Sequence, residues 1–252
     1  MSKPDKTVRR RRGVFEPFVL TSVAVIILIG LGIWQLDRKI WKEQLIEMVT
    51  QRLAAPPASG LPPRDQWIRL KPEQEEYRRV TFPAEYLNEQ EALVYTAGSA
   101  FRSDVSGPGY WVFTPVRLVG GSIVIVNRGF VPLDRKDPAT RKDGSLTGIV
   151  DIVGVIRFPE ARELFTPADE PKNNVWYVRD PKMIGEAKNW GRVSPFYVEQ
   201  EEPQPPGNLP RAGRLEVKLT NNHLQYALTW FALAVVFVLC FLSWLRSRLR
   251  ES

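Results

Sequence analysis

The sequence predicts a membrane protein in which two transmembrane α-helices flank a mainly antiparallel, β-rich extracytoplasmic domain with one short helix. Two long apolar runs, short β-rich runs between them, and basic residues at both ends support this prediction. The expected segments are a basic tail (1–17), a first transmembrane helix (18–36), a juxtamembrane helix (37–55), the β-rich domain (56–221), a second transmembrane helix (222–245) and a second basic tail (246–252).

The first apolar run covers residues 18–36, FVLTSVAVIILIGLGIWQL, and Gln35 is its only strongly polar side chain. At about 1.5 Å per residue it gives roughly 30 Å of helix, which matches the hydrocarbon core of a bilayer. A cleaved signal peptide is the alternative, because VRRRRGVF is a basic start that loosely resembles a twin-arginine signal. The run is too long for that and lacks a following small-residue cleavage site, which favours a retained anchor.

The middle of the chain changes pattern after APPASGLPP, which breaks the helical spacing of the juxtamembrane segment. Clusters of glycine, proline and asparagine separate short β-rich runs, and only DPKMIGEAKNW (180–190) has helical character. We expect one antiparallel sheet system, barrel- or sandwich-like. The β-rich runs are 77–82, 92–97, 109–118, 122–131, 148–158, 174–180, 195–200 and 214–219.

The second apolar run covers residues 226–245 and follows His223, the only histidine. His223 should lie at the outer membrane interface, near a helix start capped by Thr220 or Asn221. On a helix, Tyr226, Ala227, Trp230 and Ala234 share its face. A neutral imidazole there is either an interfacial histidine hydrogen-bonded near the helix start or an axial ligand for haem iron.

Charge gives the expected orientation. The first tail holds six basic and two acidic residues, and the last seven residues hold three basic and one acidic, so most of the net +7 lies at the two ends. This is a topology signal rather than a nucleic-acid signal. We expect both termini to be cytoplasmic and the central domain periplasmic. The bacterial inner membrane is expected because the N-terminal tail is short and lacks an extended amphipathic transit sequence.

The sequence offers little for catalysis. It contains no HExxH, CxxC, GxSxG or P-loop motif, and the lone histidine restricts any Ser/His/Asp set to the membrane end. The lone Cys240 excludes an internal disulfide, and it lies about 25 Å along the helix from His223, too far to share a metal ion. In NRGF (127–130), Gly129 is expected to form a turn or bulge. We therefore expect no enzyme.

Ordered motifs run almost the whole length of the chain. GIWQLDRKIWKEQLI carries Gly32, Trp34, Gln35, Arg38 and Lys42, and it is followed by EYRRVTF, GYWVFTPV, VNRGFVP, NNVWYVRD, PPGNLP and NNHLQYALTWFALA. With these motifs the chain resembles the surfeit-locus (Surf/Shy) family of cytochrome c oxidase assembly factors. Pro83-Ala84 stands where the family usually has a glycine, and Phe130 replaces a more usual tryptophan.

The resemblance implies an assembly factor for haem–copper oxidase that binds haem a between its two membrane helices and delivers it to the catalytic subunit. His223 would be the axial ligand, with Trp34 and Gln35 at similar depth and Tyr226 and Trp230 on the histidine face. Arg38 would pair with a haem propionate, or anchor the helix by reaching water. Implied partners are the oxidase catalytic subunit, other assembly factors or haem a synthase, and the bilayer. The competing reading is a haem-free scaffold that holds an oxidase intermediate through the outer domain.

Overall fold

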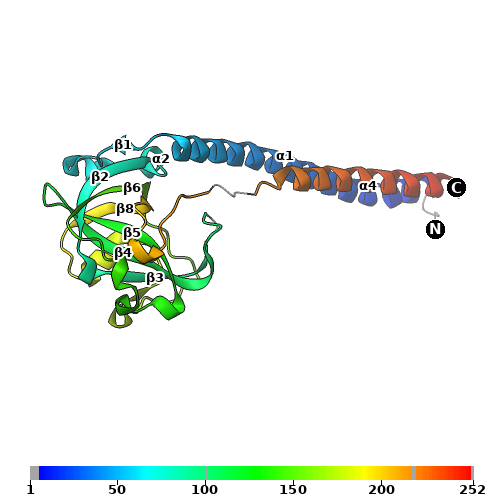
Figure 1. The fold of residues 1–252 in the computed structure, drawn as a ribbon. Helices are drawn as coiled ribbons and strands as arrows, with labels where there is room; N and C mark the ends of the chain where they lie inside the picture. The colour runs from blue at the N-terminus through cyan, green and yellow to red at the C-terminus, as the bar shows by residue number, and fades with distance from the viewer. Residues whose placement is uncertain (1–5, 100, 217–219, 251–252) are drawn as a thin grey trace. The chain divides into compact units, whose positions relative to one another are not determined.

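A computed structural model of the chain describes residues 6–99, 101–216 and 220–250. These residues belong to two compact units. One combines the chain up to Glu47 with the part from Leu219 onward, and the other spans Met48–Lys218 (Figure 1). Long helices form the first unit, and a β-sheet with its loops forms the second.

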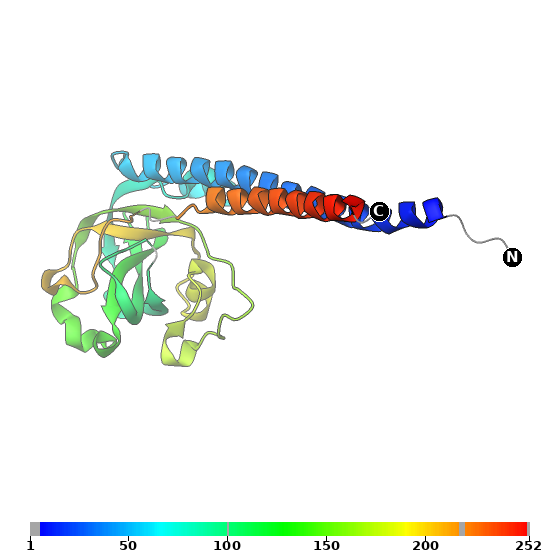
Figure 2. The same cartoon turned by 90° about the vertical axis from the view of Figure 1, so that its right-hand side faces the viewer.

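The first unit is built from α4 (His223–Arg250) and from α1 (Lys6–Ala54) as far as Glu47, two antiparallel helices that lie side by side in Figures 1 and 2. The rings of Phe18 and Phe241 lie 6.0 Å apart, and the backbone of Gly32 faces the ring of Phe231. The later a residue lies on α1, the earlier its partner lies on α4. The two apolar runs therefore lie alongside each other.

Both helices are long and apolar enough to cross a membrane. None of the most apolar window of α1, and only 6% of that of α4, is buried, whereas the core helix of a soluble protein would be mostly buried. The side-chain contacts with α4 also favour a retained first helix over a signal sequence. Helix α1 continues without interruption through the segment expected as a juxtamembrane helix and ends at Ala54.

The second unit is a closed β-barrel, which decides between the barrel and sandwich alternatives. Five strands form a ring in the order β2–β6–β8–β5–β4, and β4 pairs back onto β2. An odd number of strands closes only if one neighbouring pair is parallel, and here that pair is β5 with β8. Strands β3 and β7 extend the sheet from β4, and β1 adds to β2. The strands are β1 (Ala58–Ser59), β2 (Arg79–Tyr86), β3 (Ala92–Gly98), β4 (Ser106–Leu118), β5 (Ile123–Pro132), β6 (Ile149–Arg157), β7 (Val175–Trp176) and β8 (Val193–Glu202).

The barrel strands β5 and β8 are buried on both faces. Val124 and Val126 belong to one core cluster, whereas Ile125 between them belongs to another, because successive side chains point to opposite faces of a sheet. Phe196 and Tyr197 alternate in the same way on β8. This double burial explains why SIVIVNRGFV reads as a continuous apolar run rather than an alternating one.

Short helices connect the strands. They are η1 (Arg64–Arg69), α2 (Pro72–Glu75), η2 (Asn88–Gln90), η3 (Leu133–Arg135), η4 (Pro138–Gly144), η5 (Pro171–Asn173), α3 (Pro181–Ala187) and η6 (Pro206–Asn208). The helix expected in DPKMIGEAKNW is confirmed as α3, and the Asp180 side chain caps it by accepting from the backbone N–H of Lys182 and Met183. The strand expected over 174–180 is only Val175–Trp176, because the Tyr177 backbone N–H donates to the Asp169 side chain instead of to a neighbouring strand.

The last expected strand does not form over residues 214–216, and residues 217–219 lie outside the described part of the chain. The segment before it is held differently. Arg102 is buried and pairs with Asp104, and its guanidinium also donates to the carbonyls of Arg211, Ala212 and Gly213. Side-chain hydrogen bonds to these carbonyls thus tie 211–213 to the barrel.

A buried ion pair joins β2 to β8. Arg79 donates from Nε and Nη2 to Glu201 Oε2 at 2.9 and 2.7 Å, and from Nη1 to the carbonyl of Ala55 at 2.9 Å. We expect Glu201→Leu to lower the free energy of unfolding by about 3 kcal/mol, because it leaves a buried guanidinium without its counter-charge. The double variant Arg79→Met/Glu201→Leu should recover part of this loss in urea unfolding. A double variant less stable than Glu201→Leu would contradict this account.

Candidate functional site

Asn221 fixes the position of His223 at the start of α4. Its side-chain oxygen accepts from the His223 backbone N–H at 3.4 Å, and its amide nitrogen donates to the Lys39 carbonyl of α1 at 3.3 Å. The Tyr226 N–H donates to the Asn222 carbonyl at 3.3 Å, which is the first turn of the helix. One side chain therefore both caps α4 and joins it to α1.

The two polar residues predicted at similar depth meet directly. His223 Nδ1 lies 2.6 Å from Gln35 Oε1, and both residues are partly buried. Because this oxygen only accepts hydrogen bonds, Nδ1 carries the proton in this arrangement. In the neutral imidazole with this tautomer the free lone pair is on the other ring nitrogen, Nε2, which has no hydrogen-bond partner among the described residues.

Small residues next to His223 serve the packing of α4 against α1. Ala227 is fully buried and Ala234 is nearly so. A Cβ added to Gly32 would lie 2.4 Å from the Phe231 ring, so this ring packs directly on the Gly32 backbone. These small residues therefore serve the contact between the two helices.

Gly32 provides a matched test of this packing, because Gly30 on the same helix has no atom within 4 Å of an added Cβ. We expect Gly32→Leu, but not Gly30→Leu, to separate α1 from α4. A disulfide between Phe18→Cys and Phe241→Cys, made in a Cys240→Ala background, measures their proximity. Its yield should fall in Gly32→Leu alone, and equal yields in both variants would show that Gly32 does not set the helix spacing.

Arg38 lies among tryptophans of its own helix. Its guanidinium is 5.9 Å from the Trp34 ring and 5.4 Å from the Trp41 ring, at cation–π distance. Trp34 is 50% exposed. No carboxylate in the described part of the chain pairs with Arg38. The charge is therefore available to an external anion.

The structure thus brings together some of the predicted site residues and not others. Gln35 and His223 are in contact. Tyr226 is 56% exposed and Trp230 is partly buried on the histidine side of α4. Within the described residues, no hydrogen bond or ion pair joins Trp34 or Arg38 to His223.

A family model described as the SURF1 family matches residues 22–235, which include both Gln35 and His223. The chain belongs to the SURF1 family. A SURF1-like protein of Monosiga brevicollis is 33% identical over 232 residues, covering 90% of this chain and 86% of that protein. A SURF1-like protein of Drosophila melanogaster is 37% identical over 217 residues (81% and 69%), and Surfeit locus protein 1 of Homo sapiens is 30% identical over 216 residues (81% and 69%).

SURF1 membership confirms the family expected from the motifs, a family known as oxidase assembly factors. It also corrects the expected location. The relatives from Monosiga, fly, worm, rat and human are eukaryotic, so the bacterial inner-membrane assignment is wrong. That assignment depended on a missing transit sequence, and such an absence does not identify the membrane. The two apolar helices support the coarser statement of a membrane protein.

The SURF1 motif VNRGFVP has a structural role in the barrel. Gly129 has φ +122°, and β5 carries an extra residue opposite β4 between Asn127 and Phe130, which is the expected bulge. Phe130 exchanges backbone hydrogen bonds with Arg211 at 3.1 and 2.8 Å. Arg128 donates to Asn88 at 2.9 Å. The bulge therefore opens β5 to pair with the segment that leads to α4.

A buried polar cluster in the barrel was not foreseen from the sequence. Glu199 Oε2 lies 3.6 Å from Arg157 Nη1 and 4.0 Å from Arg179 Nη1. Burial raises the pKa of the neighbouring Tyr197 to about 12. Arg157 meets Tyr197 and Glu199 through the β6–β8 pairing, and Arg179 joins them from the segment before α3, so no local motif predicts the cluster. No group of three or more metal-ligating His, Cys, Asp or Glu side chains occurs among the described residues.

Proposed function

We propose that this SURF1 protein is an assembly factor for haem–copper (cytochrome c) oxidase that binds haem a through His223 and passes it to the catalytic subunit. The observation that carries the proposal is the 2.6 Å contact between His223 Nδ1 and Gln35. A histidine that ligates a metal commonly donates its other ring N–H to a protein acceptor, which fixes the tautomer and orients the ring. Gln35 supplies that acceptor here.

The surroundings of His223 fit haem a chemically. Haem a supplies an iron that accepts a neutral imidazole as axial ligand. Arg38 offers a guanidinium to a propionate, and the exposed Trp34 and Tyr226 offer rings beside it. Because the interface below His223 is filled by the packing of α1 against α4, we place the ligand on the exposed flank of the helix pair. This differs from the expectation of a site between the helices.

The haem-free scaffold remains the second candidate. One observation favours it: Met48–Lys218, the larger unit, contains neither histidine nor cysteine, and the residues of its VNRGFVP motif make structural contacts. On this view the barrel would hold an oxidase intermediate, and His223 would only position α4.

Haem loading and oxidase assembly, measured together, separate the two candidates. The full chain and its His223→Ala variant would be purified from cells that make haem a, and the same cells would be assayed for assembled oxidase. The carrier predicts about one haem a per wild-type chain, its loss in the variant, and reduced oxidase. The scaffold predicts no bound haem a and normal oxidase with His223→Ala, and that result would overturn the carrier.

A further inference from the structure

An apolar turn projects from the loop between β6 and β7. Leu164 and Phe165 at its tip are 89% and 91% exposed. The Thr166 N–H donates to the Glu163 carbonyl and the Glu163 N–H donates to Thr166 Oγ1, both at 3.1 Å. These two hydrogen bonds form a tight turn that keeps both apolar side chains in solvent.

Side chains at the neck of the loop hold the turn in place. Arg162 pairs with Asp169 and also donates to the Pro167 carbonyl. Asp169 accepts from the Tyr177 backbone N–H at 2.8 Å, which ties the loop to the end of β7. A pre-ordered tip that exposes two large apolar residues loses little conformational entropy on binding, as expected of a docking element.

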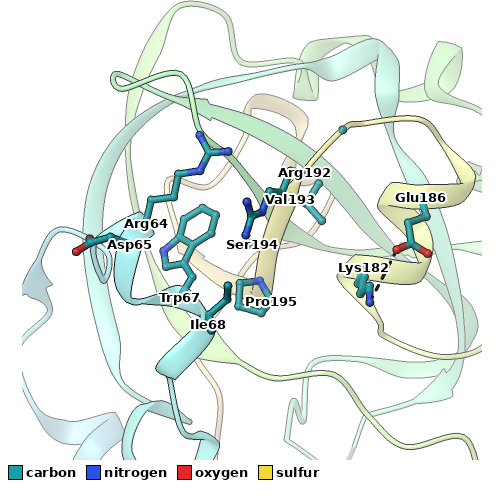
Figure 3. A pocket seen from close by; sticks show the side chains of 11 residues that line it. Arg64, Asp65, Trp67, Ile68, Lys182, Glu186, Arg192, Val193, Ser194 and Pro195 are labelled. Atoms are coloured by element: carbon teal, nitrogen blue, oxygen red, sulfur yellow. Dashed lines mark ion pairs between the residues drawn. The ribbon is translucent and has the colours of Figure 1, made fainter.

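The same domain carries a groove between η1 on one side and α3 with the start of β8 on the other (Figure 3). Its volume of about 860 Å³ lies within the range of ligand-binding pockets. Trp67 and Pro195 form its apolar floor, and Ile68 at its edge is 82% exposed. Two apolar side chains would therefore find an apolar surface there.

The charges of the turn and of the groove are complementary. Residues 159–173 hold four acidic and two basic side chains, but Asp169 pairs with Arg162 and Glu160 with Arg179, which leaves Glu163 and Glu170 against Lys172. The groove is lined by Arg64, Lys182 and Arg192 against Asp65 and Glu186. Lys182 and Glu186 lie 4.0 Å apart and offset each other, which leaves two arginines against one aspartate. An acidic turn is thus drawn to a mildly basic groove, and repelled by an anionic lipid surface.

We propose that the protein self-associates head to tail, with the Leu164–Phe165 turn of one copy docked in the groove of a second copy. Each copy presents both surfaces, so the contact is heterologous and builds short chains or a ring rather than a two-fold dimer. Phe165 and Leu164 would pack on Trp67 and Ile68, and Glu163 would face Arg192. The proposal does not depend on haem a or on the oxidase.

Disulfide trapping between two differently tagged populations of the full chain tests this contact. In a Cys240→Ala background, one population carries Ile68→Cys and the other carries Phe165→Cys. After mixing in detergent and mild oxidation, we expect a mixed covalent dimer in several-fold higher yield than with Val119→Cys in place of Phe165→Cys. Val119 is also exposed, at 76%, but lies outside both surfaces. Equal yields would overturn the proposal.

Charge reversal and lipid exposure complete the test. Arg192→Glu in the Ile68→Cys chain should lower the yield, and Glu163→Lys in the Phe165→Cys chain should restore it. Failure of this rescue would contradict the docked geometry. A fluorophore on Phe165→Cys that shifts to the blue on addition of phosphatidylcholine vesicles, without a mixed dimer, would assign the turn to the bilayer and overturn self-association.

Discussion

Replacing Gly129 with alanine is expected to lower the free energy of unfolding of the barrel by more than about 4 kcal/mol. Two causes act together. The φ of +122° is a backbone conformation that side chains other than glycine rarely adopt, and the new Cβ would lie 2.1 Å from the Arg211 carbonyl oxygen. Because the obstacle is backbone, it cannot rotate away. The Phe130–Arg211 bridge would have to open.

Gly121→Ala is the matched control for this experiment. Gly121 also has a positive φ, of +78°, but an added Cβ there meets nothing within 4 Å. It should cost only about 1–2 kcal/mol, which is the backbone strain alone. Both variants would be unfolded by urea in detergent and followed by tryptophan fluorescence. Equal losses would show that close approach of the 211 segment does not limit the side chain at Gly129.

Gln35→Met is expected to weaken haem a binding by about 10- to 100-fold, the usual effect of removing a side chain that orients a metal ligand. Methionine has a similar length but gives His223 Nδ1 no comparable acceptor. Gln35→Glu keeps an acceptor at the same place. It should therefore bind haem a more tightly than Gln35→Met does, by the same factor. Affinity would be measured by optical titration of the detergent-solubilised chain with haem a. Wild-type affinity in Gln35→Met would contradict a role for Gln35 in orienting the imidazole.

Hydropathy, together with equal helix depth, was enough to predict the helix pair and the similar depth of Gln35 and His223. Two apolar runs that cross the same bilayer must end at the same interfaces, whereas the direct contact between the two side chains is a finding of the structure. The capping residue could also be predicted, because asparagine oxygens near a helix start accept hydrogen bonds from free backbone N–H groups. These features depend on local spacing or on membrane thickness.

Three features depend on long-range pairing and could not be predicted from local spacing. They are the closure of the barrel, the cluster around Glu199 and the groove beside Trp67. The β2–β4 register that closes the ring joins residues about thirty positions apart, and no local pattern encodes it. RLEVKL has a strand-like alternation, yet no strand forms over residues 214–216, and the segment before it is held by Arg102 together with the Phe130–Arg211 bridge. Tertiary contacts therefore override the local β-propensity of residues 214–216.

The central claim is that His223 ligates the iron of haem a. The most direct measurement is the optical and electron paramagnetic resonance spectrum of the haem a-loaded full chain, compared with His223→Ala with and without added imidazole. Leu224→Ala, a change at the exposed neighbouring residue, serves as the control. The account predicts an altered spectrum in His223→Ala alone and its restoration by imidazole. A spectrum unchanged by His223→Ala would contradict the claim.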